Sequence, residues 1–257
     1  VSADFDAGNN SLVLTATGTG GITLDHTITA SAVSLVTDDI DFSTGGALLT
    51  GASGTISIAP NSGAVTEVDI GPGLGASAGV LRVDSGLLLA STAGSVTISA
   101  GTSWSIEVGA GGAVDLSTKA YGLSLQASGG LDFGNTLTLA NSETFTIASP
   151  GGITDSTGAG VPAIVISGGT LVITGTTADI GSSGSALQTE VAELGGVTGT
   201  GHLFLTNTGA LDVTGDVTLT AGGVATGNLI GTASPLTISA NMSVVGDLAL
   251  TAGDNEI

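Results

Sequence analysis

Short runs of alternating apolar and hydroxyl-bearing residues recur along this chain, and their close spacing constrains the fold more than any other feature. Leu12–Ala16 reads LVLTA, Thr55–Ala59 reads TISIA and Leu236–Ala240 reads LTISA. Such alternation places one set of side chains inward and the other outward on a β-strand. The runs follow one another at roughly eight- to nine-residue intervals, which leaves no room for crossover helices.

Two all-β architectures fit strands spaced so closely, an antiparallel sandwich or barrel and a solenoid. The antiparallel fold predicts Asn-Gly or Asp-Gly hairpin turns, and neither dipeptide occurs in the sequence. A solenoid tolerates frequent glycine at its corners, and the chain has 44 glycines. The sequence therefore predicts an all-β parallel β-helix (β-solenoid) with about three short strands per coil and about ten coils.

No domain boundary interrupts this pattern, so residues 1–257 are expected to form a single β-helix segment. Strand signals thin out near residues 180–201, which predicts an irregular excursion from the coils, and Val68–Ala78 predicts a wide corner. The ends are strand-like rather than capped, and an uncapped solenoid exposes unpaired strand edges. We therefore expect a segment of a longer protein or a fibre subunit, which associates end to end or packs on neighbouring coils of the same protein.

The charge of the chain excludes several classes of partner. It carries 22 Asp and Glu against 2 Lys and Arg, for a formal net charge of −20. Nucleic acids and anionic membrane surfaces are bound through Lys and Arg side chains, and only Arg82 and Lys119 are available. We therefore expect neither as a partner. The absence of cysteine also excludes a disulfide framework and thiolate metal ligands.

Residues 179–215 carry the most distinctive phrase of the sequence, DIGSSGSALQTEVAELGGVTGTGHLFLTNTGALDVTG. This phrase resembles a recurring module of filamentous-haemagglutinin-type exoproteins and related autotransporter adhesins of Gram-negative bacteria. The matching positions are Ile180, Gly181, Leu187, Thr189, Val191, Leu194, Phe204, Leu205, Asn207, Gly209, Leu211 and Val213. The resemblance implies a right-handed parallel β-helix that is secreted or held at the cell surface of a Gram-negative bacterium. It also implies an adhesive or stalk role, with host or surface glycans as targets.

Asp38, Asp39 and Asp41 form the densest group of carboxylates. Asp39 and Asp41 lie two residues apart and share one face of a strand. Carboxylate oxygens are ligands of Ca²⁺, a carboxylate pair can serve an inverting glycosidase, and a solvated outer face needs neither role. The three residues are the candidate calcium site, and no other cofactor is expected. The remaining acidic residues are interpreted as scattered surface charge, and they include Glu67, Asp69, Glu107 and Asp132.

The expected function is structural rather than catalytic. Parallel β-helices include polysaccharide lyases and glycoside hydrolases, so a polysaccharide-active chain is the alternative. Enzymes that act on acidic sugars use basic residues, of which the chain has 2, and the candidate aromatic sugar platforms are Trp104 and Tyr121. We therefore expect no enzyme but an extracellular structural or adhesive β-solenoid, such as a stalk, surface fibre or filament subunit. Carboxylates that converge beside Trp104 or Tyr121 would favour the alternative.

Overall fold

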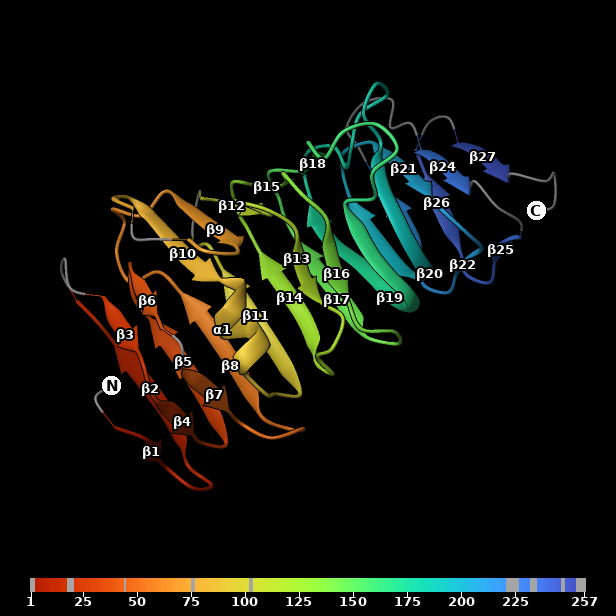
Figure 1. Ribbon diagram of the computed structural model, residues 1–257. Coiled ribbons are helices and arrows are strands. Elements are labelled where there is room, and N and C mark those ends of the chain that lie inside the picture. The colour runs from red at the N-terminus through yellow and green to blue at the C-terminus, as the bar shows by residue number, and fades with distance from the viewer. Residues whose placement is uncertain are drawn as a thin grey trace.

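The computed structural model describes residues 3–17, 21–43, 45–74, 77–101, 104–220, 227–231, 235–245 and 248–252. The chain forms a parallel β-solenoid of about 9 turns with 54% of its residues in strands. The predicted all-β solenoid is therefore confirmed. Figure 1 shows the strands stacked side by side along one axis, from the coils near the N-terminus to those near the C-terminus.

The turns contribute to three stacks of parallel strands. The first stack holds β2 (Ser11–Thr15), β5 (Ala32–Val36), β8 (Thr55–Ala59), β11 (Ser95–Ser99), β14 (Gly122–Gln126) and β17 (Thr144–Ala148). The second stack holds β3 (Ile22–Leu24) and β6 (Ile40–Phe42), then β10 (Val80–Asp84), β9 (Glu67–Gly71), β12 (Ser105–Val108), β15 (Gly130–Phe133) and β18 (Ile153–Asp155). The third stack holds β1 (Phe5–Asp6), β4 (Thr27–Thr29) and β7 (Ala47–Leu49), then β13 (Val114–Leu116) and β16 (Leu137–Leu139).

Two long strands, β19 (Ile164–Thr176) and β20 (Leu187–Gly199), continue the solenoid beyond these turns. β19 pairs with β16 of the third stack and β17 of the first. β20 pairs with β19, with register shifts, and then with β21, β22 and β23. The last turns are formed by β21 (Leu203–Asn207), β22 (Leu211–Val213), β23 (Val217–Leu219), β24 (Gly227–Gly231), β25 (Leu236–Ile238), β26 (Met242–Val244) and β27 (Leu248–Ala252).

The interior of the solenoid consists of aliphatic columns, because every second residue of each strand points inward. Val33, Ile56 and Val96 lie in register on β5, β8 and β11, and all three are buried. The rings of Phe133 and Phe145 are also buried, with their centroids 6.4 Å apart in an edge-to-face arrangement, which aromatic pairs favour. Thin columns of this kind need few aromatic residues, in agreement with the composition.

In the range 180–201, where an irregular excursion is expected, the structure has a non-strand segment over 181–186 and then a strand whose pairing with β19 shows register shifts. β20 covers Leu187–Gly199 within this range. Its alternation is hard to recognise because the inward-facing Thr189 is polar. The Thr189 hydroxyl donates a hydrogen bond of 2.8 Å to Oδ1 of the buried Asn207, so the interior accepts it.

The wide corner expected at Val68–Ala78 also begins later than predicted, because β9 extends to Gly71. Within β9, Asp69 lies between Val68 and Ile70, which are both buried. A single acidic residue between two inward-facing apolar residues is thus compatible with a strand of the stack.

One short helix, α1 (Ser85–Ala90), takes the place of a strand between β7 and β13. The carboxylate of Asp84 caps its first turn by accepting a hydrogen bond of 2.6 Å from the Gly86 N–H. Leu87 and Leu88 are buried, so the helix closes the core at this turn. Within the described part of the chain, no helix is both long and apolar enough to cross a membrane.

Candidate functional site

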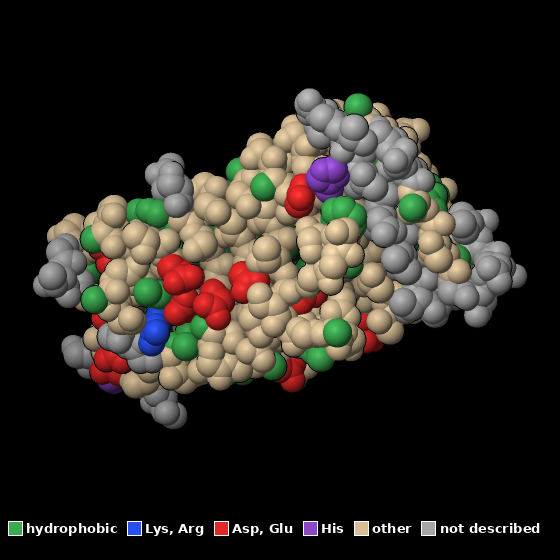
Figure 2. All heavy atoms as spheres, turned by 90° about the horizontal axis from the view of Figure 1, so that it is seen from above, with side chains coloured by type: hydrophobic (Ala, Val, Ile, Leu, Met, Phe, Trp, Pro, Cys, Tyr) green, Lys and Arg blue, Asp and Glu red, His purple; other side chains and the backbone are tan. Residues whose placement is uncertain are grey.

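Four acidic residues lie together on the outer surface of β9, β12 and β15. The parallel register places Asp69 opposite Glu107, and Glu107 opposite Asp132. Glu67 lies two residues before Asp69 and points to the same side of β9. Figure 2 shows acidic side chains gathered beside a basic one on this side of the rod. The interpretation of these four residues as scattered charge is therefore wrong, and together they form the carboxylate row (Glu67, Asp69, Glu107 and Asp132).

The buried neighbours of the row determine its outward direction. Val68 and Ile70, which flank Asp69, are buried, and so are Ile106 and Val108, which flank Glu107. A register slip of one residue would turn the carboxylates into the core. The sequence signal for the row is therefore an acidic residue in the middle of an apolar triplet, as in VDI, IEV and LDF.

Close packing at the following corner keeps these strands in register. A Cβ on Gly71 would collide with the carbonyl oxygen of Ala110. Gly109 has a φ of 88°, and a Cβ there would lie 2.5 Å from the Cβ of Asn135. Left-handed backbone of this kind favours glycine. The Asn135 side chain then donates a hydrogen bond of 2.8 Å from Nδ2 to the carbonyl oxygen of Gly109.

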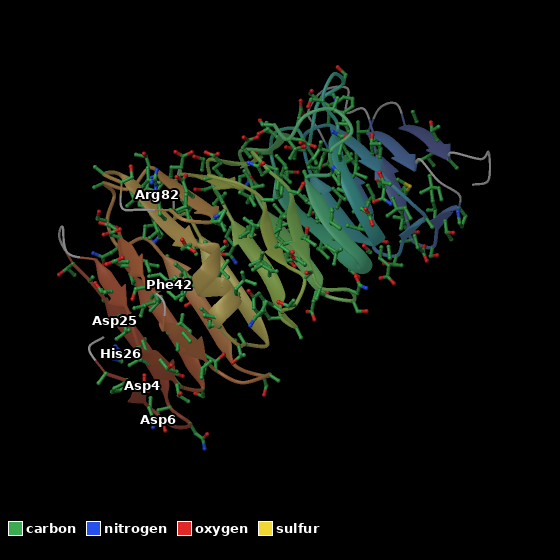
Figure 3. The ribbon with its side chains drawn as sticks, viewed as in Figure 1. Asp4, Asp6, Asp25, His26, Phe42 and Arg82 are labelled. Atoms are coloured by element: carbon green, nitrogen blue, oxygen red, sulfur yellow. The ribbon has the colours of Figure 1, made fainter. Side chains whose placement is uncertain are left out.

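Arg82 lies at one end of the row. It is opposite Asp69 on the neighbouring strand β10, and its Nε is 3.4 Å from Oδ2 of Asp69. Figure 3 places Arg82 well away from the Asp25–His26 pair of the N-terminal coils. Arg82 is one of only 2 basic residues in the chain, so the row has little positive charge to balance it.

Asp132 lies at the other end of the row, and two hydroxyl groups donate to one oxygen of its carboxylate. Thr154 and Ser156 each donate a hydrogen bond to Oδ1 of Asp132, at 2.5 and 2.9 Å. Thr154 is opposite Asp132 on β18. This end of the row is therefore already occupied by protein donors.

In the middle of the row, three carboxylates lie close together, and one of their oxygens accepts no hydrogen bond from the described residues. Carboxylate oxygens of Glu67, Asp69 and Glu107 all lie within 4.8 Å of one another. The Asp69 side chain is 9% exposed, and its Oδ1 is buried and accepts no hydrogen bond from the described residues. Glu67, Asp69 and Glu107 form the acidic triad, and it contains a buried acceptor for which the described residues supply no hydrogen-bond donor.

The surroundings of the acidic triad oppose its negative charge. Burial raises the pKa of Asp69 above its ordinary value, although the Arg82 guanidinium acts in the opposite direction. The pKa of Glu107 is also raised, first by burial and then by the negative charges of Asp69, Glu67 and Asp132. Like charges directly opposite one another destabilise a sheet, so an ionised triad carries a cost to folding.

Two kinds of chemistry suit this arrangement. Clustered carboxylate oxygens are ligands for a hard divalent cation such as Ca²⁺. A carboxyl group with a raised pKa beside an ionised carboxylate is also the arrangement of a glycosidase acid and its partner. The triad offers no nitrogen or sulfur ligand, which are the ligands that structural zinc sites prefer.

The structure places the predicted calcium residues Asp38, Asp39 and Asp41 around the start of β6. The Asp38 carboxylate accepts hydrogen bonds from the backbone N–H groups of Asn61 and Ser62, both at 2.8 Å, and from the Ser62 hydroxyl. Burial acts to raise the pKa of Asp38, but these bonds outweigh it and lower the pKa. Asp38 thus holds two coils together, and calcium binding by the three residues stays a prediction.

Asp39 and Asp41 both lie beside β3. The Asp39 carbonyl oxygen accepts a hydrogen bond of 2.9 Å from the Ile22 N–H. Asp41 is exposed on β6, where it is opposite Thr23. Neither is brought to the acidic triad.

Neither predicted aromatic platform lies free on the surface. Tyr121 is buried, and its hydroxyl donates a hydrogen bond of 3.2 Å to the carbonyl oxygen of Leu88. Trp104 is partly buried against the core, and its ring lies 3.0 Å from the position that a Cβ on Gly101 would occupy. Both rings serve packing of the solenoid.

Comparisons of this chain with protein-family models, with curated proteins and with solved structures find no match. The fold and the carboxylate row are therefore the features of the chain that indicate its function.

Proposed function

We propose that this chain is part of an extracellular structural or adhesive β-solenoid of a bacterium, such as a stalk, surface fibre or filament subunit. The observation that carries the proposal is a stack of about 9 parallel turns, which makes an elongated body out of short, thin layers. Solenoids of this kind offer a long outer surface whose length grows with the number of turns. The adhesin-like phrase at residues 179–215 supports the same role.

The first turn provides a surface on which such a rod can be continued. Among the described strands, β2 pairs with β5 alone. Leu12 and Leu14 of β2 point inward but are half-buried, whereas Val33 and Leu35, opposite them on β5, are buried. A further coil or another copy of the chain would cover this edge, because an open strand edge is a template for pairing.

A cell-surface display experiment tests this proposal. The chain is displayed on a non-adherent bacterium, and attachment to host cells, extracellular matrix and immobilised glycans is measured together with electron microscopy of the surface. The proposal predicts attachment or visible fibres that depend on the displayed chain. Smooth cells that attach no better than undisplayed controls would contradict it.

The second candidate function is cleavage of a polysaccharide, and the acidic triad is the observation that favours it. Its oxygens lie within 4.8 Å of one another, close to the ~5–5.5 Å that separates the carboxyl groups of retaining glycosidases. The packed positions of Trp104 and Tyr121 weigh against this candidate. Release of new reducing ends from a panel of neutral and acidic polysaccharides, abolished by Glu107→Gln, would replace the structural proposal by this one.

A further inference from the structure

The acidic triad lacks a partner that its geometry requires. Oδ2 of Asp69 faces Arg82 on β10, whereas Glu107 lies on the other side of β9, on β12. The second carboxylate oxygen of Asp69 is Oδ1. This atom is buried and accepts no hydrogen bond from any residue that the structure describes. A buried acceptor without a donor costs free energy, and folded proteins rarely leave one unsatisfied.

The charges of the row point to the nature of the missing partner. The carboxylate row carries four negative charges when all of its carboxyl groups are ionised, and the neighbouring Arg82 contributes one positive charge. The parallel ladder spaces its strands by only about 4.8 Å, so the carboxylates cannot move far apart. At neutral pH a bound cation relieves this repulsion, and it supplies the electron-pair acceptor that Asp69 Oδ1 lacks.

We propose that Glu67, Asp69 and Glu107 bind one hard divalent cation at a site shared by β9 and β12, and that this cation is preferentially Ca²⁺. All the ligand atoms are carboxylate oxygens, which Ca²⁺ accepts in six- to eightfold, flexible coordination that water completes. Mg²⁺ demands near-ideal octahedral geometry and gives up its water reluctantly, so it binds more weakly here. Asp132 keeps its hydroxyl donors and is not one of the three ligands.

The bound ion would join two turns that are distant in sequence. β10, α1 and β11 lie between β9 and β12 along the chain. A cation held by Asp69 and Glu107 therefore ties β9 to β12. The site does not depend on whether the chain is adhesive or acts on polysaccharides, since either role needs a stable stack.

Calcium titration of the full chain by isothermal calorimetry, after treatment with chelator, tests the proposal. We expect one site, with binding at least about tenfold weaker in Glu107→Gln and in Asp69→Asn, because Ca²⁺ affinity follows the number of charged ligands. Both substitutions keep the side-chain size, and circular dichroism in chelator confirms that each variant is folded. Glu67→Gln, at a more exposed position, gives a third variant should Asp69→Asn fail to fold.

Asp115→Asn is the matched control, because Asp115 is an exposed, outward-facing acidic residue on β13 and belongs to neither candidate calcium site. The proposal predicts that its calcium affinity equals that of the unmodified chain. A loss of binding in Asp41→Asn but not in Glu107→Gln would move the ion to Asp38, Asp39 and Asp41 and overturn the proposal. Equal, partial losses in all variants would indicate a diffuse response to net charge and would also overturn it, as would no binding at millimolar Ca²⁺.

Discussion

Glu107→Gln is expected to stabilise this protein when no divalent cation is present, which is unusual for the loss of a half-buried charge. The substitution keeps the size of the side chain and removes its repulsion with Glu67 and Asp69, whose oxygens lie within 4.8 Å. At this distance one pair of charges repels by about 0.9 kcal/mol in the dielectric of water, and by more in the protein. Two such pairs therefore predict a gain of about 1–2 kcal/mol in the free energy of unfolding.

The pH dependence of this gain follows from the raised pKa of Glu107. In the folded chain Glu107 releases its proton at higher pH than in the unfolded chain, where the pKa is about 4.3. The folded state therefore binds more protons between these two values, and ionisation of Glu107 lowers stability as pH rises through the folded-state pKa. The groups that face Glu107 are Glu67 and Asp69 on β9 and Asp132 on β15, with Arg82 behind Asp69.

Urea unfolding followed by circular dichroism, in chelator at pH 7.5 and again near pH 4.5, measures this effect. We expect the variant to unfold at higher urea than the unmodified chain at pH 7.5, and we expect the difference to shrink near pH 4.5. Asp115→Asn is a control that should be less stable to urea than the unmodified chain at pH 7.5, because hydrogen bonds from Ser117 lower the pKa of Asp115. A Glu107→Gln variant that is less stable than the unmodified chain at pH 7.5, or a difference that pH does not alter, would refute the reasoning.

Three further predictions concern packing, the interior and self-association. Gly109→Ala should lower the free energy of urea unfolding by about 1–3 kcal/mol, because it places a methyl group against Asn135 at a φ of 88°. The loss should exceed that of Gly175→Ala, where φ is 66° but no atom lies within 4 Å of the added methyl group. Equal losses would show that the corner at Gly109 is not tightly packed. Asn207→Ala should lower the free energy of unfolding by about 2–4 kcal/mol, since it leaves the Val191 N–H and the Thr189 hydroxyl without their acceptor. Asn10→Ala, at an exposed position, should change this free energy by no more than about 0.5 kcal/mol. A small effect of Asn207→Ala would contradict the hydrogen-bond network in the interior. Leu14→Lys changes the open edge of β2 and should lower the mass of the assemblies measured by light scattering. Val13→Lys should leave this mass unchanged, because the Val13 side chain faces outward and is 64% exposed. Equal effects of the two substitutions would argue against stacking through the edge of β2.

The strands of this fold follow from the sequence more readily than their register does. The predicted runs at Leu12–Ala16 and Thr55–Ala59 correspond to β2 and β8, because alternation is a local property. Register depends on how much chain each turn consumes, and this varies. Leu12 pairs with Val33, whereas Ile56 pairs with Val96, since β9, β10 and α1 lie between β8 and β11.

This variation explains why the carboxylate row escaped prediction. Asp69 and Glu107 are adjacent in space because β9 lies between β10 and β12 in the sheet, although β10, α1 and β11 separate β9 from β12 along the chain. The predicted cluster of Asp38, Asp39 and Asp41 is dense in sequence, but its first member is engaged by Asn61 and Ser62. Density along the chain is thus a weaker guide to a site in a solenoid than the position of each acidic residue within its own turn.

The most direct test of this account is a disulfide cross-link between β9 and β12, which is straightforward because the chain has no native cysteine. Cysteines in place of Asp69 and Glu107 would lie opposite each other on adjacent strands, within the ~4.4–6.8 Å between Cα atoms that a disulfide spans. Cysteines in place of Asp69 and Ser105 are the control, because Ser105 is opposite Glu67 instead. The account predicts that mild oxidation closes the first pair rapidly and leaves the second largely reduced, as judged by gel mobility and mass spectrometry. Preferential closure of the Asp69–Ser105 pair, or of neither pair, would contradict the stacked register and the acidic triad built on it.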